Sequence, residues 1–145
     1  MARRKSMNRG GKKLKSGLEV YCYDKLKEAK LKFDYEPESF TLVDRFIYPG
    51  IYFKSTNKRA DMMDYSGKVV RKMEYTPDFV SHQHKFIIET KGYQRTQHGF
   101  PLRWKLFLKQ MVDTGNGDYM LFVPKNSKQV DKVIQIIKDE IKKAK

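Results

Sequence analysis

The chain has 145 residues and a formal charge of +14 at pH 7, and 39% of its residues are hydrophobic and 13% aromatic. This length predicts one domain, and the apolar content excludes a disordered polycation. The charge favours a polyanionic partner, with nucleic acid considered first and an anionic membrane second. No apolar run approaches the ~18 residues of a membrane span, and the N-terminus lacks the apolar middle of a secretory signal. The single cysteine, Cys22, excludes an internal disulfide and indicates a reducing cytoplasm.

Basic residues dominate the start of the chain, and we expect residues 1–15 to form a flexible basic arm. The first sixteen residues carry seven Lys or Arg and no acid. Phosphate contact is favoured over the alternative, a solubilising tail, because a dense basic segment beside a basic domain attracts a polyanion. The residues that we assign to DNA contact in this segment are Arg3, Arg4, Lys12, Lys13 and Lys15.

The first helix is expected to begin after Ser16. Ser16 and Glu19 have the S-x-x-E spacing of a capping box, and apolar residues at helical spacing follow to about Lys30. Residues 33–46 then read as extended chain, and Pro49-Gly50 is a turn signal.

The segment from 51 to 74 is less regular. Ile51-Tyr52-Phe53 is consistent with a strand, the polar residues 55–64 with a loop, and Ser66-Gly67 with a hairpin turn that leads into a strand over 68–73. A β-hairpin and a long flexible excursion both fit this pattern, and the hairpin is favoured.

The remainder alternates strands and helices. Residues 75–80 and 85–91 are predicted strands, Pro101 fits the first turn of a helix, residues 119–123 form a buried-type strand, and apolar residues from Val130 to Ile141 mark a last helix. The order predicts an α/β (α+β) fold, with a mixed central β-sheet flanked by helices in one domain over 16–145.

Three residues on the two central strands need an explanation. Glu89 and Lys91 are two apart and therefore project from the same face of a strand. In a hairpin that turns near residues 82–84, the partner of Asp78 falls near residue 88 or 89. Charged groups at the end of an apolar strand must be paired or must bind a metal.

Two adjacent carboxylates repel each other unless a cation lies between them. Their oxygens suit Mg²⁺ or Mn²⁺, a metal-bound water is acidified, and a nearby amine can orient that water. Beside a polyanion this arrangement favours phosphodiester hydrolysis. The alternative is a structural salt bridge between Glu89 and Lys91 with Asp78 as a turn cap.

A family resemblance bears on this choice. Pro77-Asp78 followed by Glu89-Thr90-Lys91 resembles the signature of the PD-(D/E)XK nucleases. The ordered set that includes these residues resembles phage Holliday-junction resolvases of the endonuclease I type over roughly residues 14–125. The segments of that set are Ser16-Gly17-Leu18-Glu19, Phe33-Asp34-Tyr35-Glu36, Tyr75-Thr76-Pro77-Asp78-Phe79 and Glu89-Thr90-Lys91-Gly92.

The resemblance implies a restriction-endonuclease-like core and a role for each matching residue. Asp78, Glu89 and the backbone carbonyl of Thr90 would ligate divalent metal, and Lys91 would activate the attacking water and stabilise charge. Glu19 would complete the metal site or support it, and this role is favoured over its alternative as a capping residue.

The resemblance implies a metal-dependent, structure-selective DNA endonuclease that resolves four-way junctions or other branched DNA during recombination. It implies a homodimer of phage or bacterial origin that acts in the host cytoplasm, with Mg²⁺ or Mn²⁺, no small-molecule cofactor and no membrane. The stretch 37–74 is longer than the link usual in that family, where this region carries the strand and bridge exchanged between subunits. The alternatives are a related nuclease acting on transposon ends or forks, and a non-catalytic basic nucleic-acid-binding module.

Several other side chains have competing interpretations. Arg95 and Arg103 are expected to contact phosphate, and for Arg103 a solvated helix face is an equal alternative. His82 and His84 are expected to be exposed turn residues rather than metal ligands. His98 is expected in the polar loop after the strand over 85–91, and contact with the scissile phosphate is its less favoured alternative. Trp104 is expected in the core, and Cys22 is expected to be an inert buried thiol.

Overall fold

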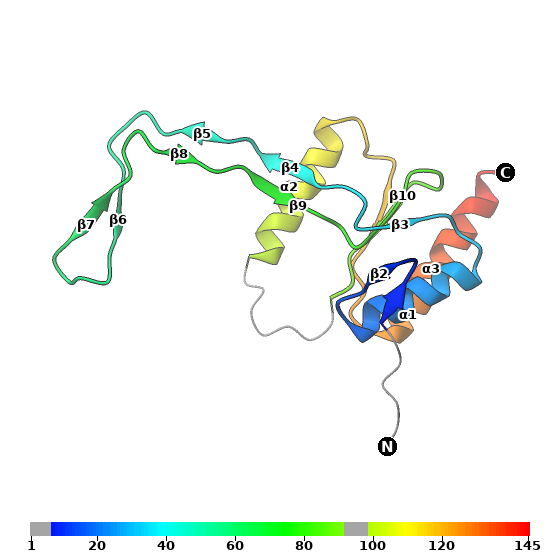
Figure 1. Cartoon of the computed structure of the whole chain (residues 1–145). Coiled ribbons are helices and arrows are strands. Elements are labelled where there is room, and N and C mark those ends of the chain that lie inside the picture. The colour runs from blue at the N-terminus through cyan, green and yellow to red at the C-terminus, as the bar shows by residue number, and fades with distance from the viewer. Residues whose placement is uncertain (1–6, 92–98) are drawn as a thin grey trace, which may run out of the picture. The chain divides into compact units, whose positions relative to one another are not determined.

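The computed structural model describes residues 7–91 and 99–145, and it combines helices and strands (Figure 1). Helix accounts for 33% and strand for 24%, which agrees with the mixed α+β class expected from the sequence. The chain divides into two compact units, the first comprising residues up to Ser39 and from Thr76 onward, the second Phe40–Tyr75. The described residues include no helix that is long and apolar enough to cross a membrane.

A four-stranded sheet organises the first unit. Its strand order is β12–β11–β10–β3. β10 pairs antiparallel with both β3 and β11, whereas β11 and β12 are parallel. The strands are β3 (Asp34–Tyr35), β10 (Phe79–Ser81), β11 (Phe86–Ile88) and β12 (Met120–Phe122).

Three helices belong to the same unit: α1 (Gly17–Glu28), α2 (Phe100–Asp113) and α3 (Ser127–Lys143). α1 and α3 lie side by side on one side of the strands (Figure 1) and share a core with alternate residues of β10 and β11. Val80 and Ile87 point to the opposite face, because successive strand residues alternate, and both are fully buried. The central strands are therefore covered on both faces, which is why they are apolar throughout.

The helix ends agree with the sequence expectations. The Ser16 hydroxyl accepts a hydrogen bond from the Glu19 backbone N–H at 3.1 Å, which satisfies one of the donors left free at a helix start. Pro101 lies in the first turn of α2, where a missing N–H costs nothing.

The second unit is a two-stranded antiparallel ribbon formed by one excursion of the chain. It has three paired regions: β4 (Phe40–Val43) with β9 (Met73–Tyr75), β5 (Phe46–Ile47) with β8 (Val69–Val70), and β6 (Phe53–Ser55) with β7 (Met62–Asp64). The hairpin favoured by the sequence is thus present, but its reversal lies between β6 and β7. The prediction that Ser66-Gly67 forms the hairpin turn was wrong, because these residues interrupt one side of the ribbon.

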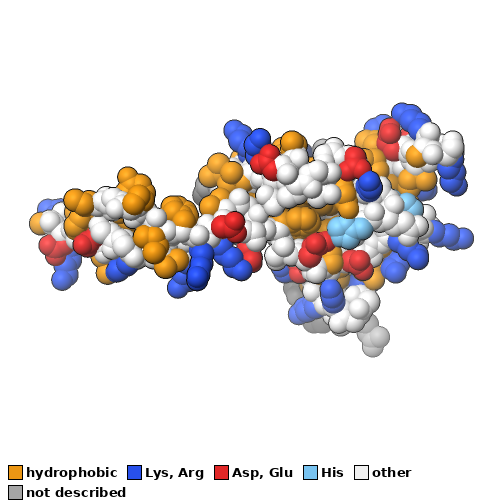
Figure 2. All heavy atoms as spheres, turned by 90° about the horizontal axis from the view of Figure 1, so that it is seen from above, with side chains coloured by type: hydrophobic (Ala, Val, Ile, Leu, Met, Phe, Trp, Pro, Cys, Tyr) orange, Lys and Arg blue, Asp and Glu red, His pale blue; other side chains and the backbone are white. Residues whose placement is uncertain are grey.

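The ribbon has no buried face of its own. Phe46 pairs with Val70, and Ile47 with Val69, so neighbouring pairs place apolar side chains on opposite faces. All four are exposed, and Figure 2 shows hydrophobic side chains on the surface of this unit. A ribbon of two strands is only marginally stable in water on its own.

Two sequence expectations about organisation differ from the structure. Residues 8–13 are not a flexible arm, because β1 (Asn8–Arg9) and β2 (Lys12–Lys13) form an antiparallel hairpin. Leu14 is only 1% exposed and belongs to the core, which attaches this hairpin to the first unit. The single domain expected over 16–145 is instead two compact units, since the ribbon is too thin to share a core.

Candidate active site

Asp78 and Glu89 are adjacent across the two central strands. Phe79 of β10 pairs with Ile88 of β11, so the next position along the ladder places residue 78 opposite residue 89. This confirms the register expected from the sequence. Both side chains are buried, at 7% exposure each. The fold therefore removes two carboxylates from water at the same end of an apolar sheet.

Thr90 holds Asp78 in place. Asp78 Oδ2 accepts hydrogen bonds from the Thr90 backbone N–H at 2.8 Å and from the Thr90 hydroxyl at 2.7 Å. Two donors on one oxygen fix the carboxylate orientation and leave Oδ1 to point elsewhere. The contacts of Thr90 thus run through its N–H and its hydroxyl, and the role expected for its carbonyl stays a prediction.

Glu19 caps the start of α1 and also lies in the acidic cluster around Asp78. Its Oε2 accepts the Lys15 backbone N–H at 2.7 Å, so it caps the helix start one residue before Ser16. Its Oε1 accepts the Tyr35 hydroxyl at 3.2 Å, and the side chain is only 4% exposed. Capping therefore does not remove the carboxylate from the cluster around Asp78.

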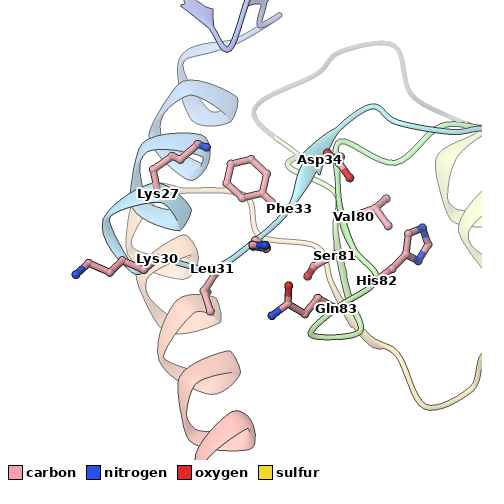
Figure 3. A pocket seen from close by; sticks show the side chains of 10 residues that line it. Lys27, Lys30, Leu31, Phe33, Asp34, Val80, Ser81, His82 and Gln83 are labelled. Atoms are coloured by element: carbon pink, nitrogen blue, oxygen red, sulfur yellow. The ribbon is translucent and has the colours of Figure 1, made fainter.

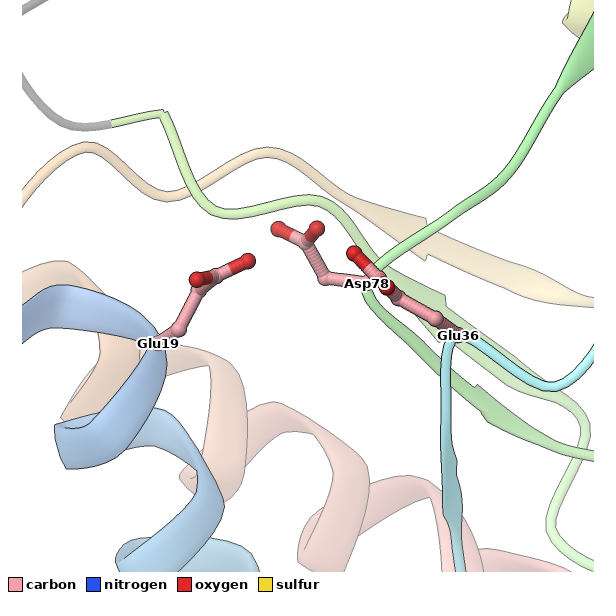
Figure 4. A group of neighbouring side chains, drawn as sticks. All are labelled: Glu19, Glu36 and Asp78. Carbon is pink, nitrogen blue, oxygen red and sulfur yellow. The ribbon is translucent and has the colours of Figure 1, made fainter. Parts of the chain in front are cut away.

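Glu36 is a member of this cluster that the sequence did not assign to the site. One carboxylate oxygen each from Glu19, Glu36 and Asp78 lies within 4.8 Å of the others (Figure 4). The Glu36 backbone N–H donates to the Asp78 carbonyl at 2.8 Å, and its φ of 45° lies in the left-handed region. Lys15 Nζ lies 2.8 Å from Glu36 Oε1. The sequence signal that could have pointed to Glu36 is its place in the segment Phe33-Asp34-Tyr35-Glu36, which contributed to the family resemblance but was given no role in the site.

Glu89 and Lys91 form the other side of the site. Their backbone N–H groups donate to the carbonyls of Phe122 and Pro124 at 2.9 and 2.8 Å, which extends the parallel pairing with β12. Lys91 Nζ lies 3.6 Å from Glu89 Oε2 and 4.0 Å from the centre of the Phe100 ring. Glu89 is outside the group of three carboxylates with oxygens within 4.8 Å, so the predicted trio of Glu19, Asp78 and Glu89 is not the closest one among the described residues.

Burial and mutual repulsion make the charged forms of these carboxylates unfavourable. Burial, followed by the charge of Glu89, raises the pKa of Asp78 to about 8, although the hydrogen bonds from Thr90 oppose that rise. Burial and the charge of Glu19 likewise raise the pKa of the Tyr35 hydroxyl well above its ordinary value. A bound divalent cation would offset the repulsion, and an all-oxygen donor set fits Mg²⁺ or Mn²⁺.

Cys22 does not take part in chemistry at this site. The thiol is fully buried in the core, and burial raises its pKa far above the ordinary value, with the charges of Asp78 and Glu19 adding to the effect. A thiol that stays protonated is a poor nucleophile and a poor metal ligand. The sequence expectation of an inert thiol is consistent with this environment.

The predicted DNA-contact residues lie in different surroundings. Arg3, Arg4 and Arg95, together with His98, fall outside the described residues. Two of the others have partners: Lys12 Nζ donates to the Tyr35 carbonyl at 2.8 Å, and Lys15 pairs with Glu36. Lys13 is exposed, and so is Arg103 in the first turn of α2.

The two turn histidines have protein partners. His82 contacts Glu38 through Nε2 and the Tyr119 hydroxyl through Nδ1, the latter at 2.6 Å. The His84 ring stacks on Phe86. Both lie in the turn between β10 and β11, as expected, where His82 is exposed and His84 is half-buried. Trp104, expected in the core, is only half-buried, and its ring packs against that of the buried Phe107 with centroids 5.4 Å apart.

Comparisons of the chain with protein-family models, with curated proteins and with solved structures find no match. The functional assignment therefore depends on the geometry of the site and on the sequence pattern.

Proposed function

We propose that the chain is a divalent-metal-dependent DNA endonuclease with a restriction-endonuclease-like core. The observation that carries the proposal is the cluster of carboxylates from Glu19, Glu36 and Asp78, of which Glu19 and Asp78 are buried and Glu36 is half-buried, with Glu89 and Lys91 beside it. A fold that gathers three buried acids and a fourth, half-buried one incurs a large electrostatic cost, and a functional cation explains why that cost is tolerated.

The residues of the site divide the chemistry between them. Asp78 and Glu89 would hold Mg²⁺ or Mn²⁺, with Glu19 or Glu36 completing the oxygen donors. The cation supplies Lewis-acid stabilisation and an acidified water when bound. Lys91, beside Glu89, would orient the attacking water and stabilise negative charge on the phosphate. Thr90 keeps Asp78 oriented through two hydrogen bonds.

We propose branched double-stranded DNA, such as a four-way junction, as the substrate. The charge of +14 supports a polyanionic partner, and the choice of branched DNA rests on the ordered resemblance to phage junction resolvases. Recognition would use phosphate contacts and DNA shape rather than base edges. The proposed setting is DNA recombination in the cytoplasm of a bacterial host.

Resolution of a junction requires cuts in two strands, so we propose a homodimer that carries two such sites. The ribbon of residues 40–75 supports this, because Phe46, Ile47, Val69 and Val70 leave both of its faces apolar and exposed. A second copy of the chain would cover these faces.

The deciding experiment is a cleavage assay on a four-way junction, a fork and a linear duplex, with Mg²⁺ or with EDTA. The variants are Asp78→Asn and, as a matched control, Asp113→Asn, an exposed carboxylate on α2. We expect the wild type and the control to cut the junction with Mg²⁺ only, and Asp78→Asn to be inactive. Absence of metal-dependent cutting would leave the non-catalytic binding module, and equal cutting of linear DNA would leave a nuclease without junction selectivity.

A further inference from the structure

A pocket lined by basic residues lies away from the carboxylates. A pocket of about 500 Å³ opens between the C-terminal end of α1, β3 and the turn from β10 to β11 (Figure 3). Leu31, Phe33 and Val80 contribute apolar surface to its lining. Its polar and charged lining residues are Lys27, Lys30, Lys32, Asp34, Ser81, His82 and Gln83.

Positive charge exceeds negative charge in this pocket, because three lysines and one carboxylate, Asp34, line it. Among residues 7–91 and 99–145, no carboxylate lies within ion-pair distance of Lys27, Lys30 or Lys32. Lys27 Nζ instead lies 5.7 Å from the Tyr23 ring centre and 5.5 Å from that of Phe33. Three lysines line this pocket, although the side chain of Lys30 extends away from it in Figure 3. Positive charges that lie close together repel each other, so a bound anion would lower the energy of the arrangement.

The pocket continues into a neighbouring hollow of about 220 Å³ that shares Lys27, Phe33 and Asp34 with it and adds Arg9 and Lys12. Together the two hollows form a groove along β3, which is an edge strand and leaves this side of the sheet open. In the added part, Arg9 pairs with Asp24 and Lys12 donates to a backbone carbonyl. The uncompensated positive charge is therefore concentrated at the lysine end.

The spacing from the candidate active site suits an extended polyanion. Glu19 lies in the first turn of α1 and Lys27 in its last turn, eight residues apart, which corresponds to about 12 Å along a helix at 1.5 Å per residue. One strand of duplex DNA advances about 3.4 Å per nucleotide along its axis. The Lys27 end of the helix thus lies roughly three to four nucleotides away from a phosphate bound at the carboxylates.

We propose that the pocket lined by Lys27, Lys30 and Lys32 binds backbone phosphates of double-stranded DNA several nucleotides from the position that is cut. The ligand chemistry is a phosphate group, and DNA is chosen over a free phosphate because the two adjoining hollows share lining residues, extend beyond the size of one phosphate group and lie on a chain of charge +14. The choice of DNA rests on the proposed function, whereas the anion site rests on the lysine cluster alone.

The test measures DNA binding without cleavage. A fluorescent four-way junction and a linear duplex are titrated in EDTA over about 50 to 200 mM salt with K27Q/K30Q/K32Q. The matched control is K128Q/K132Q/K138Q, which removes the same charge from exposed positions on α3. We expect the pocket variant to weaken binding about tenfold or more and to lower the salt slope by about 1–3, since each lost phosphate contact removes about 0.9 from that slope.

The double variant K30Q/K32Q keeps the ring contacts of Lys27, and a normal melting curve for it establishes that lost binding is not lost folding. Equal effects of the pocket and control variants would overturn the proposal, because net charge alone would then explain binding. Inorganic phosphate could shift the backbone amide NMR signals of Ser81 and Gln83 in the wild type while the pocket variant binds DNA with unchanged affinity. That pair of results would overturn DNA as the source of the phosphate. Because binding is read in EDTA, failure of the nuclease assay leaves this result unaffected.

Discussion

Asp78→Asn is expected to abolish cutting and yet to stabilise the metal-free protein at high pH. The asparagine amide keeps the shape of the carboxyl group, and its oxygen can still accept both hydrogen bonds from Thr90. It removes the charge that Glu89 and Glu19 repel. Function and stability would therefore change in opposite directions.

The magnitude follows from proton linkage. The pKa of Asp78 rises from an ordinary 3.8 to about 8 in the folded chain, so the folded state binds the proton more tightly than the unfolded state. The stability from this group is complete below about pH 4 and is lost as pH rises to about 8. The slope is at most about 1.4 kcal/mol per pH unit, which gives a ceiling of about 4 kcal/mol between about pH 5 and pH 8.

The assay is urea unfolding in EDTA at about pH 5, 6.5 and 8 for wild type, Asp78→Asn and the control Asp113→Asn. We expect the wild type and the control to lose stability with rising pH, and Asp78→Asn to be flatter, so that it is the most stable of the three at about pH 8. Parallel pH profiles for all three would refute the argument, because Asp78 would then carry no unfavourable charge in the fold.

Other predictions address the metal, the base, the ribbon and the core. At limiting Mg²⁺, cutting should rise up to about tenfold per pH unit until about pH 8, because protons compete with the cation for Asp78; a flat profile would contradict this. Lys91→Gln should lower the cutting rate by about 100-fold or more and keep the stabilisation by Mg²⁺ seen in melting curves, whereas loss of both would indicate a structural role. Ile47→Asp should shift the chain to monomer in analytical ultracentrifugation, and Ser55→Asp, also exposed on the ribbon, should not. Ile88→Ala should cost about 2–5 kcal/mol in urea unfolding, since it empties a fully buried position; a loss below about 1 kcal/mol would place Ile88 outside the core.

The parts that sequence reasoning predicted well are local in the chain. The capping residue Ser16, the antiparallel strands around the 82–84 turn, and the juxtaposition of Asp78 with Glu89 all depend on residues within about a dozen positions of each other. Propensity, side-chain alternation and turn length are sufficient at that range. The same range explains why Glu89 and Lys91 were assigned to one face.

Other features depended on contacts that are distant in sequence. The role of Glu36 arises because the edge strand β3 pairs with β10, which brings the Glu36 N–H to the carbonyl of Asp78. The basic segment near Lys12 looked flexible because charge density dominates its composition, yet the burial of Leu14 fixes it as a hairpin. Neither pattern is visible without knowing which strands are neighbours.

By itself, the sequence determined a basic α+β chain with two carboxylates and a lysine at the end of an apolar hairpin, because these features follow from composition and from short-range periodicity. Only the tertiary structure decided that Glu36 joins Glu19 and Asp78, that residues 40–75 form a separate ribbon with exposed apolar side chains on both faces, and that three lysines line a pocket near the C-terminal end of α1. These features depend on how segments distant in the sequence pack together. The free energy gained by burying side chains and pairing strands selects that packing, and the local propensities of the residues do not specify it.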